Sequence, residues 1–251
     1  MAIQTEHSLQ LGVEIKKKLK EFDLDISFSA GKGCLGILGP SGCGKSMTLK
    51  SIAGIVTPDS GRIALQYAKG EAAGGRVLYD SALKINEKPQ MRRVGYLFQN
   101  YALFPNMSVE ENIAAGLKGM EKKKAKVGEM IERFRLTGLE KRYPGQLSGG
   151  MAQRVALVRS LINEPPILLL DEPLGALDAF TRMNMQDEIL SAWKERKQLA
   201  IMVTHDVDEA IYMGTRVIVM EANPGRIKAD IPLTMDYPRN RSSSQFVAYR
   251  N

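Results

Sequence analysis

The chain has 251 residues, of which 44% are hydrophobic and 25% charged, an ordinary composition for a soluble globular protein. This length is enough for one large domain or two small ones with a sizeable core. Apolar runs such as Ile167–Leu170 and Ala200–Val203 cover only a few residues. Because a membrane-spanning helix needs roughly 18 or more apolar residues, we expect no transmembrane segment.

The net charge of +7 allows three kinds of partner: nucleic acid, an anionic membrane surface or solvent. Proteins that bind nucleic acid usually combine basic clusters with exposed aromatic side chains or a recognition helix, and we identify neither. We therefore favour a solvated basic surface. The N-terminus lacks the layout of a secretory signal, and the chain has only two cysteines, Cys34 and Cys43. Both features favour a cytosolic protein without a disulfide.

Short strands dominate the first part of the chain. Alternation of apolar and polar residues predicts strands over 13–15 and 22–28. A third, buried strand over 34–38 runs directly into a glycine-rich loop. After that loop, apolar residues at helical spacing predict a helix that ends at Gly54, followed by a turn over 57–61.

Helices dominate the middle third, and strands alternate with helices after it. Ser108 and Glu111 form a capping-box pattern, which marks the start of a helix. The alternation of strands and helices predicts a mostly parallel sheet covered on both faces. The other elements expected, in chain order, are helices over 127–134 and 151–162, a strand over 167–170, a helix over 185–193 and a strand over 199–204.

The segment Gly39–Ser46 matches the phosphate-loop pattern G-x-x-x-x-G-K-[ST] and lies between a strand and a helix, as the pattern requires. Backbone N–H groups of such a loop surround phosphate oxygens at a helix N-terminus, whose partial positive charge favours anions. We expect Lys45 to reach the β- and γ-phosphates and Ser46 to ligate Mg²⁺. A chance glycine-rich turn would not explain this context. The residues expected to bind the nucleotide here are Gly39, Pro40, Ser41, Gly42, Cys43, Gly44, Lys45, Ser46 and Met47.

Two adjacent acids follow the apolar strand over 167–170. Asp171 is expected at the C-terminal end of that strand, where α/β proteins open their ligand sites, and it can hold Mg²⁺ opposite Ser46. Glu172 can turn towards the γ-phosphate, and a second acid without a metal to bind is a natural general base for a water molecule. The alternative is a structural ion pair.

The tripeptide Ser148-Gly149-Gly150 opens a helix, so its N–H groups form a second anion-binding site. It cannot reach phosphates held by the first loop unless the chain folds back over them, whereas a second subunit could bring it across. Taken alone, the tripeptide is also compatible with an ordinary helix N-cap.

The chain resembles the ATP-binding cassette (ABC) ATPases over essentially its whole length. The motifs of that family occur in the same order and with similar spacing, as Gly39–Ser46, Gln99, Leu147–Gly150, Leu168–Pro173, Leu177-Asp178 and His205. The resemblance implies an α/β P-loop NTPase with a mostly parallel RecA-like sheet, an N-terminal antiparallel β subdomain and an inserted α-helical subdomain. It divides the single domain, 1–251, into a core over 1–98 and 156–251 and a helical subdomain over 99–155.

The resemblance also implies a head-to-tail homodimer that holds two ATP molecules. Gln99 would contact Mg²⁺ and the attacking water and sense the membrane partner. His205 would contact the γ-phosphate and hold the general base and the water in place, and Asp178 would lie across the dimer seam. The residues expected to act in catalysis are then Glu172, His205, Gln99 and Lys45; the metal would be held by Ser46, Gln99 and Asp171.

Two positions depart from this family. Met151 stands where the signature motif usually has glutamine, and we expect activity to survive this change because Ser148 and Gly150 are the expected γ-phosphate contacts. The family also stacks adenine on an aromatic residue of the N-terminal strands. Phe22 is the candidate for that contact here.

A single cassette without membrane helices resembles the ATPase subunit of a prokaryotic importer. Such a subunit lies on the cytoplasmic face of the membrane and binds integral permease subunits, with a substrate-binding protein acting indirectly. The segment Phe98–Pro105 resembles the loop of importers for inorganic anions, sugars and polyamines that faces a coupling helix of the permease. Its apolar residues Tyr101, Leu103 and Phe104 suit either that groove or the core. A soluble nucleic-acid-associated cassette is the alternative from another class.

Two segments bear on the transported solute. The run Gly75–Ser81 resembles molybdate and sulfate importers, whereas Asn223–Ile227 and Pro238–Ser242 resemble nitrate, sulfonate and taurine importers. Both indicate oxyanions, and we favour molybdate or tungstate, with nitrate, sulfonate, taurine or sulfate as alternatives. Since the chain ends at Asn251, we expect no C-terminal regulatory β-domain.

Overall fold

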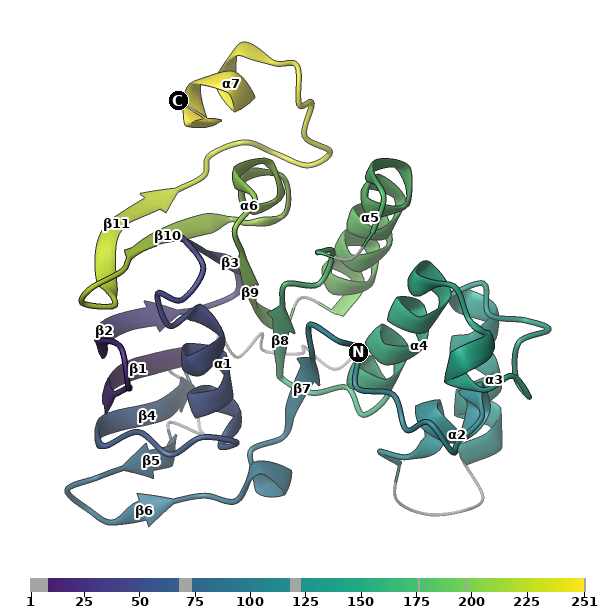
Figure 1. Ribbon diagram of the computed structural model, residues 1–251, viewed down its shortest axis with the longest axis horizontal. Coiled ribbons are helices and arrows are strands. Elements are labelled where there is room, and N and C mark those ends of the chain that lie inside the picture. Colours follow the sequence, from purple (N-terminus) through teal and green to yellow (C-terminus); the bar gives the residue numbers. More distant parts are fainter. Residues whose placement is uncertain (1–8, 68–73, 118–122, 176, 197, 251) are drawn as a thin grey trace, which may run out of the picture.

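The computed structural model describes residues 9–67, 74–117, 123–175, 177–196 and 198–250, and contains two β-sheets with helices between and beside them (Figure 1). The first sheet is antiparallel, in the order β2-β1-β4-β5-β6. Its strands alternate buried and exposed residues, because one face covers the core and the other faces water. Its strands are β1 (Leu9–Lys18), β2 (Asp23–Ala30), β4 (Ser60–Tyr67), β5 (Gly75–Asp80) and β6 (Ile85–Asn86).

The second sheet has the order β11-β10-β3-β9-β8-β7 and is parallel from β10 to β7. The β10–β11 pair is antiparallel. The carboxyl ends of its parallel strands share one edge, where the residues of the candidate site follow. Its strands are β3 (Gly33–Leu38), β7 (Val94–Leu97), β8 (Ile167–Asp171), β9 (Leu199–Thr204), β10 (Arg216–Glu221) and β11 (Arg226–Pro232).

Helices cover both faces of the parallel sheet. Alternate residues of β8 and β9 belong to two core clusters, as the period of a strand requires. One cluster contains α1 (Lys45–Ala53) and the antiparallel sheet, and the other contains α4 (Gly149–Leu161), α5 (Ala179–Arg196) and α6 (Val207–Met213). Figure 1 shows α2 (Val109–Ala114), α3 (Lys123–Arg133) and α4 grouped to one side, and α7 (Ser244–Arg250) above β10 and β11. Two 3-10 turns cover Pro89–Met91 and Pro144–Gln146.

The fold expected from the sequence is confirmed: an α/β protein with a mostly parallel sheet, an N-terminal antiparallel sheet and inserted helices. The capping box is also present, because Ser108 Oγ accepts from Glu111 N–H while the Glu111 carboxylate accepts from Ser108 N–H. The turn expected over 57–61 is shorter, since Ser60 and Gly61 already pair with β1. Among the described residues, no helix has the length and apolarity needed to cross a bilayer. The subdomain limits 1–98, 99–155 and 156–251 stay a prediction.

A fully buried arginine closes the C-terminal end of α1. Arg92 donates from Nη1 to the carbonyl oxygens of Ser51 and Ile52, at 2.8 and 2.9 Å, and from Nε to that of Glu87 at 2.9 Å. Gly54 ends the helix with φ 77°, and a Cβ on it would lie 2.6 Å from Arg92 Nε. The guanidinium thus supplies donors to the last turn of the helix after the phosphate loop, where the Ser51 carbonyl also accepts from Gly54 N–H.

Replacing Arg92 by methionine should lower the free energy of unfolding by about 2–4 kcal/mol, because buried backbone carbonyls lose their donor. Urea denaturation measures this difference. The exposed Arg226, which pairs with Glu221 at the surface, supplies the control. Arg226→Met should cost about 0.5 kcal/mol or less. Equal losses in the two variants would contradict the role given to Arg92.

Candidate active site

The glycine-rich loop between β3 and α1 has the shape of a phosphate-binding loop. Gly42 and Gly44 adopt φ values of 81° and 99°, and a Cβ on Gly44 would lie 2.7 Å from Leu24 Cδ1, so glycine is required there. Lys45 is buried, and its ammonium donates to the carbonyl oxygens of Gly39 and Pro40, at 2.8 Å each. These contacts hold a positive charge across the loop at the N-terminus of α1, an arrangement suited to a polyphosphate.

The carboxylate of Asp171 lies at the end of β8 and is 3% exposed. Ser46 Oγ donates to its Oδ1 at 2.6 Å, although the two residues are 125 positions apart in the sequence. Tyr96 on the neighbouring strand β7 donates its hydroxyl to Oδ2 at 2.8 Å. Burial, together with the nearby Asp171 charge, raises the pKa of Tyr96, so this tyrosine stays a hydrogen-bond donor.

The oxygen donors at this point fit a magnesium ion. Mg²⁺ prefers hard oxygen ligands and is usually held by one or two protein groups together with substrate phosphates and water. The Ser46 hydroxyl and the Asp171 carboxylate are such groups and already touch one another. The Gln99 side chain instead donates its amide nitrogen to Glu172. Its predicted contact with the metal stays a prediction.

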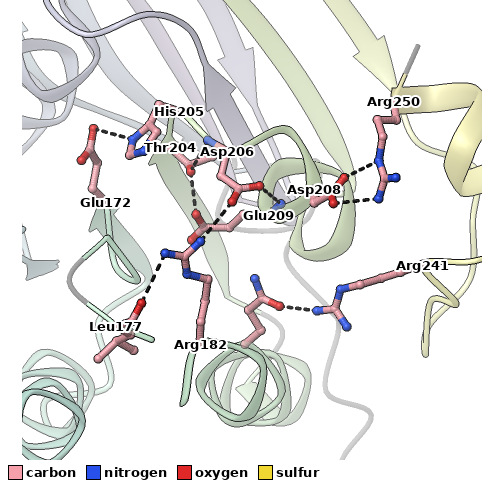
Figure 2. A network of polar contacts seen from close by, with 11 residues as sticks. Glu172, Leu177, Arg182, Thr204, His205, Asp206, Asp208, Glu209, Arg241 and Arg250 are labelled. Carbon is pink, nitrogen blue, oxygen red and sulfur yellow. Dashed lines mark hydrogen bonds and ion pairs between the residues drawn. The ribbon is translucent and has the colours of Figure 1, made fainter. Parts of the chain in front are cut away.

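Glu172 lies where three segments meet. Its φ of 45° turns the chain out of the strand direction, which is uncommon for a residue with a side chain and indicates a constrained position. Its Oε2 accepts from Gln99 Nε2 at 2.9 Å, and its Oε1 lies 3.4 Å from His205 Nδ1. The structure therefore brings together Glu172, Gln99 and His205, the three residues expected around an attacking water (Figure 2 shows the Glu172–His205 contact).

The loop that carries His205 is held by its neighbours on both sides. Asp206 caps α6, since its Oδ1 accepts from Glu209 N–H at 3.0 Å. The Thr204 hydroxyl accepts from Asp206 N–H at 3.0 Å and donates to Glu209 Oε2 at 2.6 Å. Glu209 is 4% exposed, and burial raises its pKa from an ordinary value near 4.5 to about 7.

Glu209→Gln should change how stability depends on pH. The folded chain binds a proton at Glu209 more tightly than the unfolded chain, so this contribution to stability is complete below about pH 4.5 and is lost as the pH rises through about 7. The variant cannot ionise there, and it should gain stability relative to the parent between pH 5 and pH 8. Urea denaturation across that range measures the difference. Glu195→Gln at the exposed end of α5 is the control; parallel curves for Glu209→Gln and the parent would contradict the prediction.

The second anion-binding element caps α4. Ser148 Oγ accepts from Met151 N–H at 3.3 Å, and Ser148 and Gly149 are exposed. A Cβ on Gly150 would lie 3.0 Å from Thr181 Cγ2, so this end of α4 packs closely against the start of α5. Within one chain, α1 packs on β8 and β9 whereas α4 packs on α2 and β7. Figure 1 shows α1 and α4 on opposite sides of β8, so the structure does not bring Ser148–Gly150 to the phosphate loop of its own chain.

Three more residues that the sequence predicts for the site, Asp178, Phe22 and Met47, lie at the start of α5 or beside the phosphate loop. Asp178 caps the first turn of α5 by accepting from Thr181 N–H at 3.0 Å, and its hydrogen bonds to Thr181 lower its pKa. Phe22 lies against the phosphate loop, because a Cβ on Gly44 would be 3.4 Å from its ring. Met47 is partly buried against the core. The roles of Asp178 at a dimer seam and of Phe22 at adenine stay predictions.

The segment after Gln99 is partly core and partly surface. Tyr101 and Leu103 pack against the larger core cluster, whereas Phe104 is 47% exposed. Arg159 of α4 donates to the carbonyl oxygens of Tyr101 and Ala102, at 2.8 Å each. The segment is thus held against α4, the helix whose N-cap is Ser148.

Sequence reasoning missed two residues that the structure places in the site. Tyr96 binds Asp171, and its position on the strand leading to Gln99 was the available signal. Arg182 binds both Leu177 and Asp206, and its position four residues after Asp178 could have indicated it. The Tyr96–Asp171 and Arg182–Asp206 contacts join residues that are 75 and 24 positions apart.

Comparisons with known proteins agree with this geometry. The family model for "ABC transporter" matches residues 22–175. The aliphatic sulfonates import ATP-binding protein SsuB of Bacillus subtilis is 45% identical over 233 residues, 91% of this chain and 83% of that protein. Two solved dimeric structures of the bacterial ABC transporter cassette MJ0796, one of them a post-hydrolysis state bound to ADP and Pi, are 26% identical, with TM-scores of 0.71 and 0.70. Each covers 90% of this chain and 100% of its own.

Proposed function

The chain belongs to the ABC transporter ATPases, and we propose that it is the ATP-hydrolysing subunit of an importer for aliphatic sulfonates. The observation that carries the proposal is its 45% identity over 91% of the chain to a protein named for aliphatic sulfonate import. The active-site geometry supports the ATPase part of the proposal, and the relative supports the solute.

The residues of the site divide the work of hydrolysis. The loop N–H groups and the Lys45 ammonium bind the phosphates of ATP. Ser46 and Asp171 would hold Mg²⁺, which would supply positive charge to the phosphate oxygens. Glu172 accepts a proton from the attacking water, with Gln99 and His205 fixing the orientation of its carboxylate through the contacts described above.

Two copies of the chain complete each ATP site. The phosphate loop of one protomer and Ser148–Gly150 of its partner enclose one nucleotide, because the two elements lie apart within one chain. A twofold axis then produces two equal sites with Asp178 at the seam. The dimeric structures of the MJ0796 cassette support this arrangement. ATP binding closes the dimer, and hydrolysis reopens it.

The membrane partner is a pair of permease subunits. We place the chain at the cytoplasmic face of the membrane, where the helices α2–α4 receive a coupling helix from the permease. The exposed Phe104 offers an apolar contact for it. A substrate-binding protein acts on the cassette only through the permease.

The relatives named for sulfonate import change which solute we propose. The sequence favours molybdate or tungstate on the strength of the segment over 75–81, which forms the antiparallel strand β5. The relatives named for sulfonate import support the alternative, to which the segments over 223–227 and 238–242 already pointed. We therefore prefer a sulfonate to molybdate as the transported oxyanion.

Reconstitution tests this proposal. The chain is expressed with the permease and binding protein of its importer, and the complex is placed in proteoliposomes with ATP and Mg²⁺. Ethanesulfonate with the binding protein should stimulate ATP hydrolysis and enter the vesicles, whereas molybdate should do neither. Stimulation by molybdate alone would instead indicate molybdate as the transported solute. ATPase activity that depends on DNA or RNA, falling steeply with salt, would indicate a nucleic-acid-associated cassette instead.

A further inference from the structure

Arg182, in the first turn of α5, connects two loops of the active site. Its Nη2 donates to the Leu177 carbonyl oxygen at 3.3 Å, and its Nη1 donates to Asp206 Oδ2 at 3.2 Å. Figure 2 shows its guanidinium between the segment of Leu177 and the loop of Thr204, His205 and Asp206. One side chain thus joins two segments that lie 29 positions apart in sequence.

Each end of this connection adjoins a residue of the proposed mechanism. Leu177 immediately precedes Asp178, which is proposed to face the partner subunit. Asp206 immediately follows His205, whose Nδ1 lies 3.4 Å from the Glu172 carboxylate. A planar guanidinium holds its donors in a rigid fork, so it fixes the distance between its two acceptors in a way that a lysine ammonium cannot.

The local electrostatics agree with a positioning role. The Arg182 side chain is 34% exposed and that of Asp206 is 33% exposed, so the pair is partly shielded from water. Asp206 uses separate oxygens for its two contacts: Oδ1 caps α6, and Oδ2 accepts from Arg182. The helix cap therefore does not require the arginine, and the ion pair can be removed without removing the cap.

We propose that Arg182 is a positioning residue that transmits closure of the dimer to the catalytic pair Glu172 and His205. When the partner subunit engages the segment around Asp178, Arg182 moves the loop of Asp206 with it and so orients His205. The proposal rests on the proposed ATPase function and adds a connection between the seam and the hydrolytic site. Arg182 itself touches neither ATP nor water in this mechanism.

The first test separates positioning from folding by means of a matched control. Arg216 also has a side chain that is 34% exposed, and it also binds one carboxylate, Asp230, and one backbone carbonyl, Ser29 O. It lies at the start of β10, at the end of the parallel sheet remote from the phosphate loop. Arg182→Met and Arg216→Met thus remove comparable interactions, but only the first adjoins the active site.

Steady-state ATPase assays of the purified full chain measure kcat and KM, and thermal melts check that each variant is folded. Arg182→Met should lower kcat by between about 10- and 100-fold, the size of effect that misplaced catalytic groups produce, with an unchanged KM for ATP. Arg182→Lys should recover part of kcat, because an ammonium can reach one of the two acceptors. Arg216→Met should keep the parental kcat. Parental kcat in Arg182→Met, or an equal loss of kcat in Arg216→Met, would overturn the proposal.

A double-mutant cycle tests the route through Asp206. Asp206→Asn keeps an N-cap oxygen for α6 but removes the charge that Arg182 binds. If Arg182 acts through Asp206, the double variant should have the same kcat as either single variant, whereas multiplied losses would overturn the route. Failure of the function itself gives a different result. In that case the parent chain itself would not hydrolyse ATP.

Discussion

Glu172→Gln is expected to bind ATP like the parent and to hydrolyse it about 10²–10⁴ times more slowly, the range attributed to a general base. The amide has the shape of the carboxylate but cannot accept a proton from water at neutral pH. The bonds that hold Lys45 across the phosphate loop and the Ser46–Asp171 pair are untouched by the change. Because closure is no longer followed by hydrolysis, the ATP-bound dimer should accumulate.

Two measurements check this result. Single-turnover hydrolysis reports the chemical step, and size-exclusion chromatography with light scattering, with and without ATP, reports the dimer. Glu195→Gln, at the exposed end of the same chain's α5, is the control and should hydrolyse ATP like the parent. Hydrolysis by Glu172→Gln at the parental rate would show that Glu172 is not the base, and the carboxylate would then serve only to orient its neighbours.

The parts of the site that the sequence predicts are those in which one short segment determines its own geometry. The bonds from Lys45 to Gly39 and Pro40 close the phosphate loop locally, and side-chain caps at Ser108 and Ser148 begin their helices within three residues. The strand before Asp171 is predicted for a similar reason, since the four consecutive apolar residues Ile167–Leu170 indicate a strand covered on both faces, and all five residues of β8 are buried.

The contacts that could not be predicted join residues far apart in sequence. Tyr96 and Asp171 are 75 positions apart, and Arg92 and Ile52 are 40 apart. A tyrosine in a short strand and an arginine after a 3-10 turn look ordinary until the fold brings their partners close. The sequence also predicts no helix after Thr204. Helices α6 and α7 have only seven residues each, too few to show helical periodicity.

The transported solute is a further property that the sequence of this chain does not determine by itself. β5, which suggested molybdate, is a strand of the antiparallel sheet, where it pairs with β4 and β6. The tail segment over 238–242 contains Arg239, which donates to backbone carbonyls at the end of α6, and Arg241, which binds Gln186. Both segments make contacts within the chain's own fold, so they do not identify the solute.

Two separately inactive variants should together restore hydrolysis if each ATP site is built from two chains. Lys45→Ala removes the ammonium that is proposed to bind the phosphates. Gly149→Asp places a carboxylate in the second anion-binding element, and the chain should tolerate it: a Cβ at Gly149 would lie 3.9 Å from its nearest neighbour, and an acid at a helix N-terminus is favourable. Each homodimer should lose activity by about 100-fold or more, as when a preorganised charge contact to the transition state is lost.

The heterodimer of these two chains distinguishes the possible architectures. Differently tagged chains purified in tandem contain one site with both defects and one site with neither, because each site takes its phosphate loop from one chain and its Ser148–Gly150 element from the other. Such a heterodimer should recover about half of the parental activity if the two sites act independently. Gly149→Asn, which adds similar bulk without charge, should impair the homodimer less than Gly149→Asp. If Ser148–Gly150 served its own chain's phosphate loop, every chain of the heterodimer would carry one defect and mixing would restore nothing. Recovery in this experiment would therefore establish that the two anion-binding elements of the chain meet only across the interface between two protomers.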